Sequence, residues 1–286
     1  MTEADEARHT GKLYLCATPI GNLQDVTLRV LDTLKEADLV AAEDTRRTRQ
    51  LFSRYDIHTP LLSYREENRD AAGARLLKRL EAGDTVALVS DAGTPGISDP
   101  GQHLVGLCIE RGITVEALPG PNAAIAALVI SGLPTGRFSF QGFLPRKTGA
   151  RRKALEALAH DERTMLFHES PPRVEGTLSD MLEVLGDRRM ALARELTKKF
   201  EEVIRGTVSS VAAALASREI KGEIVLVVEG SPPAAGTMDE GEAIDEVMRL
   251  RGKGLSLKEA VAVVVEEKAP GMSRSALYNA AVKRTG

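Results

Sequence analysis

The residues with the clearest chemical potential lie in a glycine-rich loop that follows a buried strand. Residues 85–90 are rich in Val, Leu and Ala, which is typical of a strand buried in a parallel sheet. The loop at residues 91–101 contains three glycines and two carboxylates, Asp91 and Asp99. It has neither lysine nor a GK[ST] or GxGxxG spacing, so it does not resemble a loop that binds phosphate or a dinucleotide. Carboxylates instead suit a ligand that carries amines, hydroxyls or positive charge.

The position of this loop favours a ligand site, although the residue types also fit a structural turn. Residues 102–111 carry apolar side chains at helical spacing, so the unit reads as strand, loop and helix. Ligands of open α/β sheets bind at the carboxyl ends of the strands, where glycines let the backbone approach them. Asp91 and Asp99 can equally cap helices or bond their own backbone. Taken alone, the loop leaves both interpretations open.

Three further motifs accompany the glycine loop along the chain. They are TPIGN at residues 18–22, AEDTR at 42–46 and PGPNA at 119–123. Together with SDAGTPGISDPG at 90–101, and in this order, they resemble the tetrapyrrole-methylase-like family of S-adenosylmethionine enzymes. Within that family the chain is similar to the branch of small-subunit ribosomal RNA 2′-O-methyltransferases. The resemblance covers residues 11–230.

The resemblance implies that S-adenosylmethionine is the cofactor and that particular residues contact it. The sulfonium and ammonium groups of this cofactor also fit an acidic loop without lysine. The implied contacts in the first half of the chain are Pro19, Asp91, Ala92, Gly93, Thr94, Ile97, Ala123 and Ala124. In the second half, the resemblance places Phe167, Ala193 and Ile224 over the adenosine. For these three, a place in the core of a strand is the alternative reading.

The resemblance also implies an activity and its partners. The reaction is methyl transfer from S-adenosylmethionine to the ribose 2′-hydroxyl of a cytidine in the 16S RNA of the 30S subunit. The protein is then expected to be a cytoplasmic homodimer, and no metal-binding residues are assigned. A methyltransferase acting on a small tetrapyrrole, and a ribosome-associated binding protein without catalysis, remain as alternatives.

Candidate catalytic residues follow an apolar run that lies before the glycine loop in the sequence. Glu43, Asp44 and Arg46 directly follow an apolar run at residues 39–42. Because this run reads as a parallel strand, its end should lie on the same edge of the sheet as the glycine loop. The acidic groups can handle the proton of a hydroxyl, while Arg46 and Lys198 can bind phosphates. Helix capping by Asp44 and a solvated Arg46 are the alternative.

Two basic stretches predict contact with RNA phosphates, which supplies affinity rather than sequence readout. The alternative is a solvated surface run. The second stretch ends a helix-turn-helix-like tail. The candidate RNA-binding residues are Arg146, Lys147, Arg151, Arg152 and Lys153 in the first stretch, and Arg274 and Lys283 in the second.

The pattern of strands and helices that must position these residues predicts two α/β domains and a small helical C-terminal module. The cofactor cleft is expected between the two α/β domains. Strands and helices alternate up to residue 135, which predicts a mostly parallel sheet with helices on both faces. A hairpin across residues 197–199 predicts a mixed second sheet. The expected divisions are a disordered tail (1–10), two domains (11–135 and 136–230), a linker (231–236) and a basic helix-turn-helix-like module (237–286).

Composition agrees with a chain that buries sizeable cores and binds nucleic acid only locally. The 286 residues are 43% apolar and carry a formal net charge of −3, which argues against a protein basic over its whole surface. Cys16 and Cys108 lie in apolar runs and are expected to be buried free thiols. The apolar runs are too short for a membrane span and no signal peptide is recognised, so we expect a soluble cytosolic protein.

Overall fold

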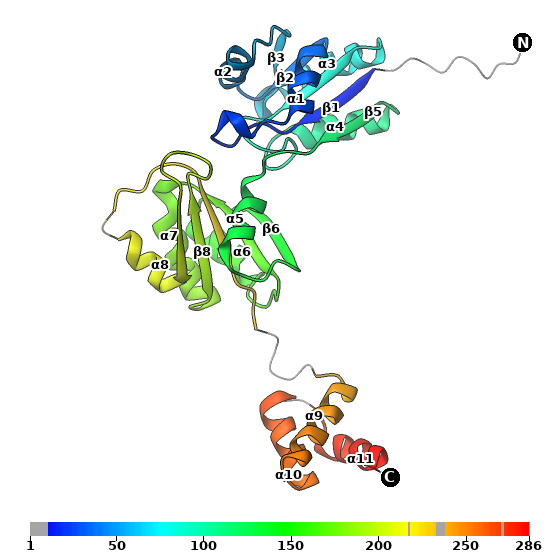
Figure 1. Cartoon of the computed structure of the whole chain (residues 1–286), viewed down its shortest axis with the longest axis vertical. Helices are drawn as coiled ribbons and strands as arrows, with labels where there is room; N and C mark the ends of the chain where they lie inside the picture. The colour runs from blue at the N-terminus through cyan, green and yellow to red at the C-terminus, as the bar shows by residue number, and fades with distance from the viewer. Residues whose placement is uncertain (1–10, 217, 233–237, 270–271, 286) are drawn as a thin grey trace, which may run out of the picture.

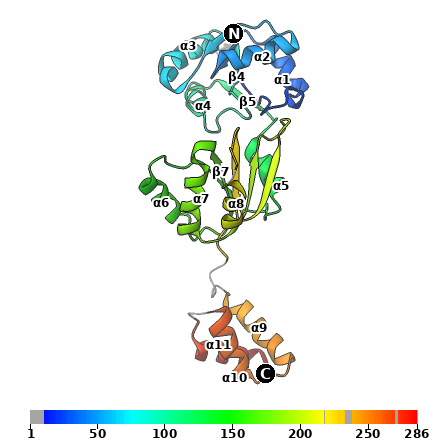
Figure 2. The ribbon, with the colours of Figure 1, turned by 90° about the vertical axis from the view of Figure 1, so that its left-hand side faces the viewer.

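The computed structural model describes residues 11–216, 218–232, 238–269 and 272–285. Two α/β domains follow one another along the chain, and a set of helices forms the C-terminal module (Figures 1 and 2). The predicted tail at 1–10, most of the linker at 231–236 and residues 270–271 of the C-terminal module lie outside the described residues.

The first domain contains a sheet of five strands in the order β3-β2-β4-β1-β5, all of them parallel. Helices cover both faces of the sheet, as predicted, because each face carries its own cluster of buried apolar side chains. The strands are β1 (Lys12–Cys16), β2 (Leu39–Ala42), β3 (Leu61–Ser63), β4 (Thr85–Val89) and β5 (Thr114–Leu118). The helices are η1 (Leu23–Asp25), α1 (Leu28–Glu36), α2 (Thr45–Tyr55), η2 (Glu66–Asn68), α3 (Arg69–Glu81) and α4 (Gly101–Glu110).

Local sequence signals explain where these helices begin. The Thr27 hydroxyl accepts the backbone N–H of Val30 at the start of α1, and the Asp44 carboxylate accepts that of Arg46 at the start of α2. The cysteines predicted to be free and buried are so. Burial raises the pKa of the Cys16 thiol to about 12.

The second domain contains a mixed sheet in the order β6-β7-β10-β8-β9. Strand β6 runs parallel to β7, the other neighbours are antiparallel, and the predicted β8–β9 hairpin is present. The strands are β6 (Phe138–Phe143), β7 (Thr164–Glu169), β8 (Arg189–Arg194), β9 (Glu202–Thr207) and β10 (Ile224–Val228). The large apolar cluster on one face joins the sheet to α6 (Thr148–Glu156), α7 (Pro171–Leu185) and α8 (Val208–Leu215).

Helix α5 (Ala123–Ser131) follows the first sheet in sequence but packs on the other face of the second. Its Ala124, Ala127 and Leu128 share a buried cluster with residues of β7, β8 and β10. The chain therefore passes between the two sheets at residues 119–122, which is earlier than the boundary expected at 135. Ile20, from the loop after β1, joins the same cluster and ties the two domains together.

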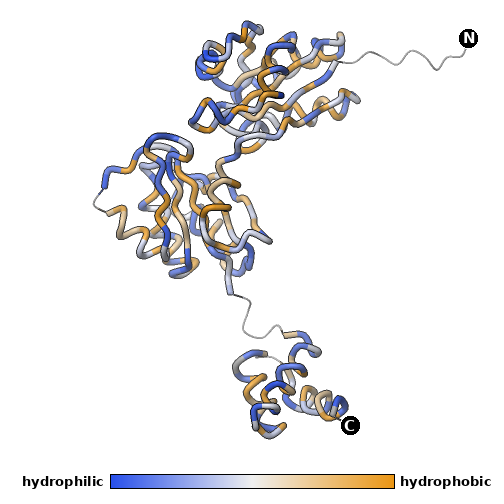
Figure 3. The backbone as a smooth tube through the Cα atoms, viewed as in Figure 1, coloured by the Kyte–Doolittle hydropathy of each residue, from blue (hydrophilic) through white to orange (hydrophobic). Residues whose placement is uncertain are grey.

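The C-terminal module has a small core of its own. It consists of α9 (Glu240–Gly252), α10 (Leu257–Val263) continued by the π-helical turn η3 (Val264–Lys268), and α11 (Arg274–Thr285). Buried aliphatic side chains from all of these helices meet in one cluster, and hydrophobic and hydrophilic segments alternate along the helices (Figure 3). The two helices expected to form a helix-turn-helix are thus the last two of a packed group. Within the described parts of the chain, no helix combines the length and apolarity that crossing a membrane requires.

Candidate functional site

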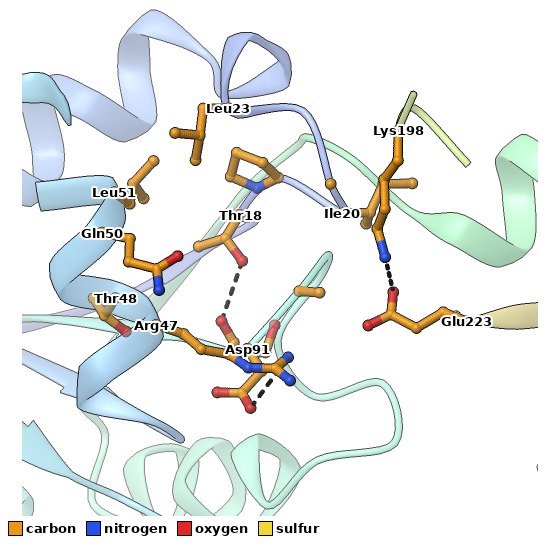
Figure 4. Close-up of a pocket in the computed structure, with 14 residues that line it drawn as sticks. Thr18, Ile20, Leu23, Arg47, Thr48, Gln50, Leu51, Asp91, Lys198 and Glu223 are labelled. Carbon is orange, nitrogen blue, oxygen red and sulfur yellow. Dashed lines mark hydrogen bonds and ion pairs between the residues drawn. The ribbon is translucent and has the colours of Figure 1, made fainter. Parts of the chain in front are cut away.

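A cleft lies between the carboxyl edge of the first sheet and the second domain, and it has two adjoining lobes. We name the first the α2 lobe, shown in Figure 4, and the second the β7 lobe. The residues common to both lobes are Ile20, Arg47, Ser90, Asp91, Ala92 and Glu223. The α2 lobe adds Thr18, Pro19, Gly21, Thr48, Gln50 and Lys198, among others. The β7 lobe adds Glu43, Ile97, Ser98, Asp99, Ala123, Phe143, His168, Glu169, Ile224 and Val225.

Hydrogen bonds tie the predicted motifs together at this edge. Thr18 and Gly93 exchange two backbone hydrogen bonds of 2.9 Å, and the Thr18 hydroxyl donates to the Ser90 carbonyl at 3.1 Å (Figure 4). The Thr94 hydroxyl donates to the carbonyl of Pro121 at 3.2 Å. The loops after β1, β4 and β5 therefore form one surface, and the predicted gathering of motifs is confirmed.

Within the glycine loop, Asp91 and Asp99 have different tasks. Asp99 accepts the backbone N–H groups of Gly96 and Gly101, at 2.9 and 2.7 Å. It therefore stabilises its own loop, as expected for a residue of a structural turn. Asp91 instead accepts the backbone N–H of Asp44 at 2.8 Å, which joins the loop to the end of β2. Gly93 has a φ of +81°, a conformation in which glycine is favoured.

Carboxylates dominate the electrostatics of the cleft. Burial raises the pKa of the Glu43 carboxyl above its ordinary value, and the negative charges of Asp91 and Asp99 raise it further. Arg47 partly offsets them, with its Nη1 3.7 Å from the Asp91 carboxylate. A site where carboxylates repel one another gains from a ligand that brings positive charge. The sulfonium and ammonium of S-adenosylmethionine meet this requirement, and Ala92 and Ala123 line the same lobe with small side chains.

The structure places the expected cofactor contacts in three kinds of position. Those that line the cleft are Pro19, Asp91, Ala92, Ile97, Ala123 and Ile224. Gly93 and Thr94 hold the loop to its neighbours, as described above. The side chains of Ala124, Phe167 and Ala193 are buried in the apolar clusters of the second sheet. For Phe167 and Ala193, the side chains therefore follow the core reading and do not line the cleft.

The expected catalytic residues also differ in whether they line the cleft. Asp44 caps α2, and its carboxylate holds the Arg46 guanidinium through two hydrogen bonds of 3.0 and 2.7 Å. These bonds hold the pKa of Asp44 well below its ordinary value. Arg46 is 81% exposed and does not line either lobe, whereas the neighbouring Arg47 lines both. Sequence reasoning missed Arg47, because only the phase of α2 shows which of the two arginines faces the cleft.

Lys198 reaches the cleft from the β8–β9 connection of the second domain. Its Nζ lies 2.8 Å from the Glu195 carboxylate. The same atom lies 3.5 Å from the Glu223 carboxylate, as Figure 4 shows. Its aliphatic stem lies against Gly21, where a Cβ would come within 2.4 Å of the lysine Cγ. The neighbouring Thr197 accepts the backbone N–H of Asn22 at 3.1 Å. This connection therefore docks on the TPIGN loop.

Only part of the first basic stretch, which was predicted to contact RNA, lies at the surface. Helix α6 begins at Thr148, and Arg151 lies on its buried side. Arg151 pairs with the buried carboxylate of Asp180 at 2.6 Å, and its side chain is only 9% exposed, so it is not available to RNA. Arg152 pairs with the same carboxylate at 2.7 Å but remains 38% exposed, so its contact with RNA stays a prediction. The correction has a physical cause, because the partner carboxylate lies on α7, far away in sequence. Arg146, Lys147 and Lys153 are exposed, as expected.

Many cations of the C-terminal module are paired within the module. Arg274 pairs with Glu266, and Arg284 pairs with Asp245. Glu246 holds two further cations, Arg249 and Lys268. Lys283 is exposed. The module thus presents fewer unpaired charges than its sequence suggests.

Two residues of the β7 lobe were also not predicted. Phe143 and His168 come together on neighbouring strands, with ring centroids 5.4 Å apart. No motif marks either residue, because their pairing depends on the register of β6 against β7. The signal available in the sequence was the position of both residues at the ends of short apolar runs.

The fold and the cleft define a two-domain α/β protein with a ligand site of acidic and small residues at the carboxyl edge of a parallel sheet. Residues 12–212 match the model of the tetrapyrrole (corrin/porphyrin) methylases, and the chain belongs to this family.

The chain is similar along most of its length to proteins described as ribosomal RNA small subunit methyltransferase I. It is 47% identical to that of Halalkalibacterium halodurans over 273 residues, which cover 94% of each chain. It is 45% identical to that of Haemophilus influenzae, covering 94% of this chain and 95% of the relative.

Solved structures share the fold at low sequence identity. Uroporphyrin-III C-methyltransferase from Thermus thermophilus, complexed with S-adenyl homocysteine, is 21% identical, with a TM-score of 0.57 over 77% of this chain and 97% of that one. Diphthine synthase is 15% identical, with a TM-score of 0.59 over 77% of this chain and 90% of that one. At these identities the likeness concerns the fold.

Proposed function

We propose that the protein transfers a methyl group from S-adenosylmethionine to the ribose 2′-hydroxyl of a cytidine in the 16S RNA of the small ribosomal subunit. The observation that carries the proposal is the 47% identity to a small-subunit RNA methyltransferase along 94% of both chains. The acidic cleft supports the cofactor part of the proposal, because it suits a ligand that carries positive charge. A tetrapyrrole substrate has less support, since the solved tetrapyrrole enzymes are only about half as similar in sequence.

The cofactor fits the cleft at the glycine loop. Asp91, Ala92 and Ile97 on one side, with Ala123 and Ile224 on the other, would hold it. When bound, it supplies an activated methyl group on a positively charged sulfur. The carboxylates around Glu43 then lose part of their mutual repulsion, which contributes to binding.

Residues of this chain have two tasks toward the acceptor, namely to align it and to handle its proton. Alignment of the 2′-oxygen with the methyl group supplies most of the acceleration, because the methyl donor is already reactive. Glu43 is the carboxylate that takes or orients the hydroxyl proton, and its raised pKa brings it closer to the pH at which a general base is most effective. Arg47 and Lys198, from opposite domains, hold the flanking phosphates. Asp44 and Arg46 lie beside them at the start of α2 and belong to the same proposal.

The proposal extends to the RNA surface and the assembly. The exposed Arg146, Lys147 and Lys153 contact phosphates near the cleft, and Lys283 of the C-terminal module contacts RNA further out. The protein acts as a homodimer in the cytoplasm, where the 30S subunits are. Light scattering at micromolar concentration tests the dimer, and a monomer mass would contradict it.

Competing acceptors test the function. Wild-type protein is incubated with methyl-labelled S-adenosylmethionine and one of three acceptors: 30S subunits, a short cytidine-containing oligonucleotide, or a reduced uroporphyrin. We expect label in the RNA of the 30S subunits, with the oligonucleotide much slower. Label in the tetrapyrrole would instead support the small-molecule alternative. Cofactor binding without transfer to any acceptor would support the binding protein.

A further inference from the structure

An exposed aromatic side chain and a buried nitrogen without a partner lie next to each other in the β7 lobe. Phe143 is 54% exposed at the end of β6, although most phenylalanine side chains are largely buried. His168 lies opposite it on β7, and its Nε2 is buried without a hydrogen-bond partner among the described residues. Buried polar groups normally find a partner, so an atom left alone beside a cleft points to a ligand that supplies one.

An irregularity in β6 produces this juxtaposition. The register between β6 and β7 shifts at Gln141, so that Phe140 pairs with Leu166 whereas Phe143 pairs with His168. Gly142 adopts a φ of +65° at this point. Bulges of this type redirect side chains and are frequent beside active sites. If Gln141 were paired in regular register, Gly142 would lie opposite His168. Phe143 would then lie opposite the next residue of β7.

The pair adjoins the proposed cofactor loop on one side and an exposed arginine on the other. A Cβ on Gly142 would lie 3.7 Å from the hydroxyl of Ser98, so β6 passes directly beside the glycine loop. On its other side, Phe143 shares a second hollow with Arg146, which is exposed three residues further along. A continuous path therefore runs from the cofactor loop, over the two rings, to an arginine.

The chemistry of this path matches a nucleobase and its phosphate. An exposed ring offers a stacking surface to any base, and an arginine binds phosphate. Burial lowers the pKa of the His168 imidazole, so the ring is neutral and offers one donor and one acceptor. Edge contacts from Phe140, at 5.0 Å, and Phe143, at 5.4 Å, fix the plane of this ring. The Glu223 carboxylate lines the same lobe and suits an exocyclic amine such as that of cytosine.

We propose that Phe143 and His168 form the subsite for the base of the acceptor nucleotide, which stacks on Phe143 and hydrogen-bonds to the His168 imidazole while Arg146 binds an adjacent phosphate. This inference rests on the proposed function and adds the residues that select the acceptor. It places the base on the second domain and leaves the glycine loop to the cofactor.

The test compares Phe143→Ala, Phe143→Tyr and His168→Phe with the wild type. Steady-state methylation of 30S subunits gives kcat and KM, calorimetry gives affinity for S-adenosylhomocysteine, and thermal unfolding checks the fold. Removal of a base-stacking ring is expected to raise KM for 30S subunits about 5- to 100-fold in Phe143→Ala. Phe143→Tyr should restore most of this loss because it retains the ring. His168→Phe retains an aromatic side chain without nitrogen and should lower kcat/KM with cofactor affinity unchanged.

Phe200→Ala is the matched control, because Phe200 is 67% exposed and does not line the cleft. Wild-type kcat/KM in folded Phe143→Ala and His168→Phe would overturn the subsite. A loss of cofactor affinity in these variants would also overturn it and assign the rings to the adenosine. A wild-type protein that binds cofactor but does not methylate 30S subunits would instead contradict the proposed function itself.

Discussion

The backbone N–H of Asp44 donates a hydrogen bond of 2.8 Å to the carboxylate of Asp91. The two residues lie at the ends of the neighbouring strands β2 and β4, so this bond fixes the AEDTR motif against the glycine loop. The same arrangement brings Glu43 close to Asp91, whose backbone N–H lies 3.4 Å from the Glu43 carboxylate. One bond thus joins the residues proposed to hold the cofactor to those proposed to handle the acceptor.

Gly93→Val should abolish cofactor binding while the protein stays folded. A side chain at Gly93 would be held at an unfavourable φ and would lie 3.3 Å from Ile20 at the cleft. Gly112→Val is the matched control, because Gly112 also has a positive φ, +67°, but faces open space after α4. Both changes should cost about 1–3 kcal/mol of stability through backbone strain. Calorimetry should show a loss of affinity of at least about tenfold for Gly93→Val only, and equal affinities in both would contradict the assignment of the loop.

Arg47→Ala should lower methylation of 30S subunits more than Arg46→Ala. Arg47 faces both lobes of the cleft, whereas Arg46 is held by Asp44 on an exposed surface. We expect about a tenfold fall in kcat/KM for Arg47→Ala, which corresponds to one charge-assisted hydrogen bond, and a smaller fall for Arg46→Ala. Cofactor affinity should be unchanged in Arg46→Ala and should not fall in Arg47→Ala, because loss of the cation beside Asp91 leaves the cleft more acidic. The reverse order of the two variants would show that the acceptor approaches from the Arg46 side.

Glu43→Gln should stabilise the free protein at high pH and not at low pH. Burial, Asp91 and Asp99 raise the pKa of Glu43 in the folded state, so the folded protein favours the protonated form. Its contribution to stability is complete below the unfolded-state pKa and is lost as the pH rises through the folded-state pKa. The glutamine, neutral throughout, avoids this loss. Thermal midpoints should coincide near pH 4 and be higher for Glu43→Gln near pH 8; a lower midpoint at pH 8 would show that the ionised carboxylate is stabilising.

Arg151→Ala should destabilise the second domain strongly instead of weakening RNA binding directly. Burial acts to raise the pKa of Asp180, but Arg152 and Arg151 together hold it below its ordinary value. Removing one partner of a buried pair costs about 3 kcal/mol. Urea unfolding should show this loss, and Lys153→Ala, from the exposed side of the same helix, should unfold like the wild type. Equal stability of Arg151→Ala and the wild type would contradict a structural role for the pair.

Arg151 also shows where sequence reasoning reached its limit. The motifs after β1, β2, β4 and β5 could be predicted to meet, because the ends of parallel strands share one edge and local caps mark where α1 and α2 begin. The burial of Arg151 on α6 was not predicted because its partner Asp180 is 29 residues away in the sequence. Helix α5 was assigned to the first domain because its apolar side chains do not reveal which sheet they cover. The Phe143–His168 pair depends on a bulge that strand periodicity does not show.

Truncation after Gly230 should spare cofactor binding and weaken binding to 30S subunits. The C-terminal module has its own apolar cluster, and the residues that line the cleft all precede it. Phosphate contacts release counterions, so the logarithm of the binding constant falls linearly with the logarithm of the salt concentration. The slope of this line should be shallower by about 1–2 for the truncated protein. This small change reflects the pairing of Arg274 and Arg284 inside the module. Full-rate methylation by the truncated protein across a salt series would exclude the module from RNA binding.

The central claim is most directly tested by the chemical identity of the product. Unmethylated 30S subunits are incubated with methyl-labelled S-adenosylmethionine and the wild-type protein, and the 16S RNA is digested to nucleosides and separated. The account predicts that the label elutes as 2′-O-methylcytidine, and that Gly93→Val under the same conditions yields none. Label in a base-methylated nucleoside, or no label in the RNA while the cofactor is bound, would contradict it.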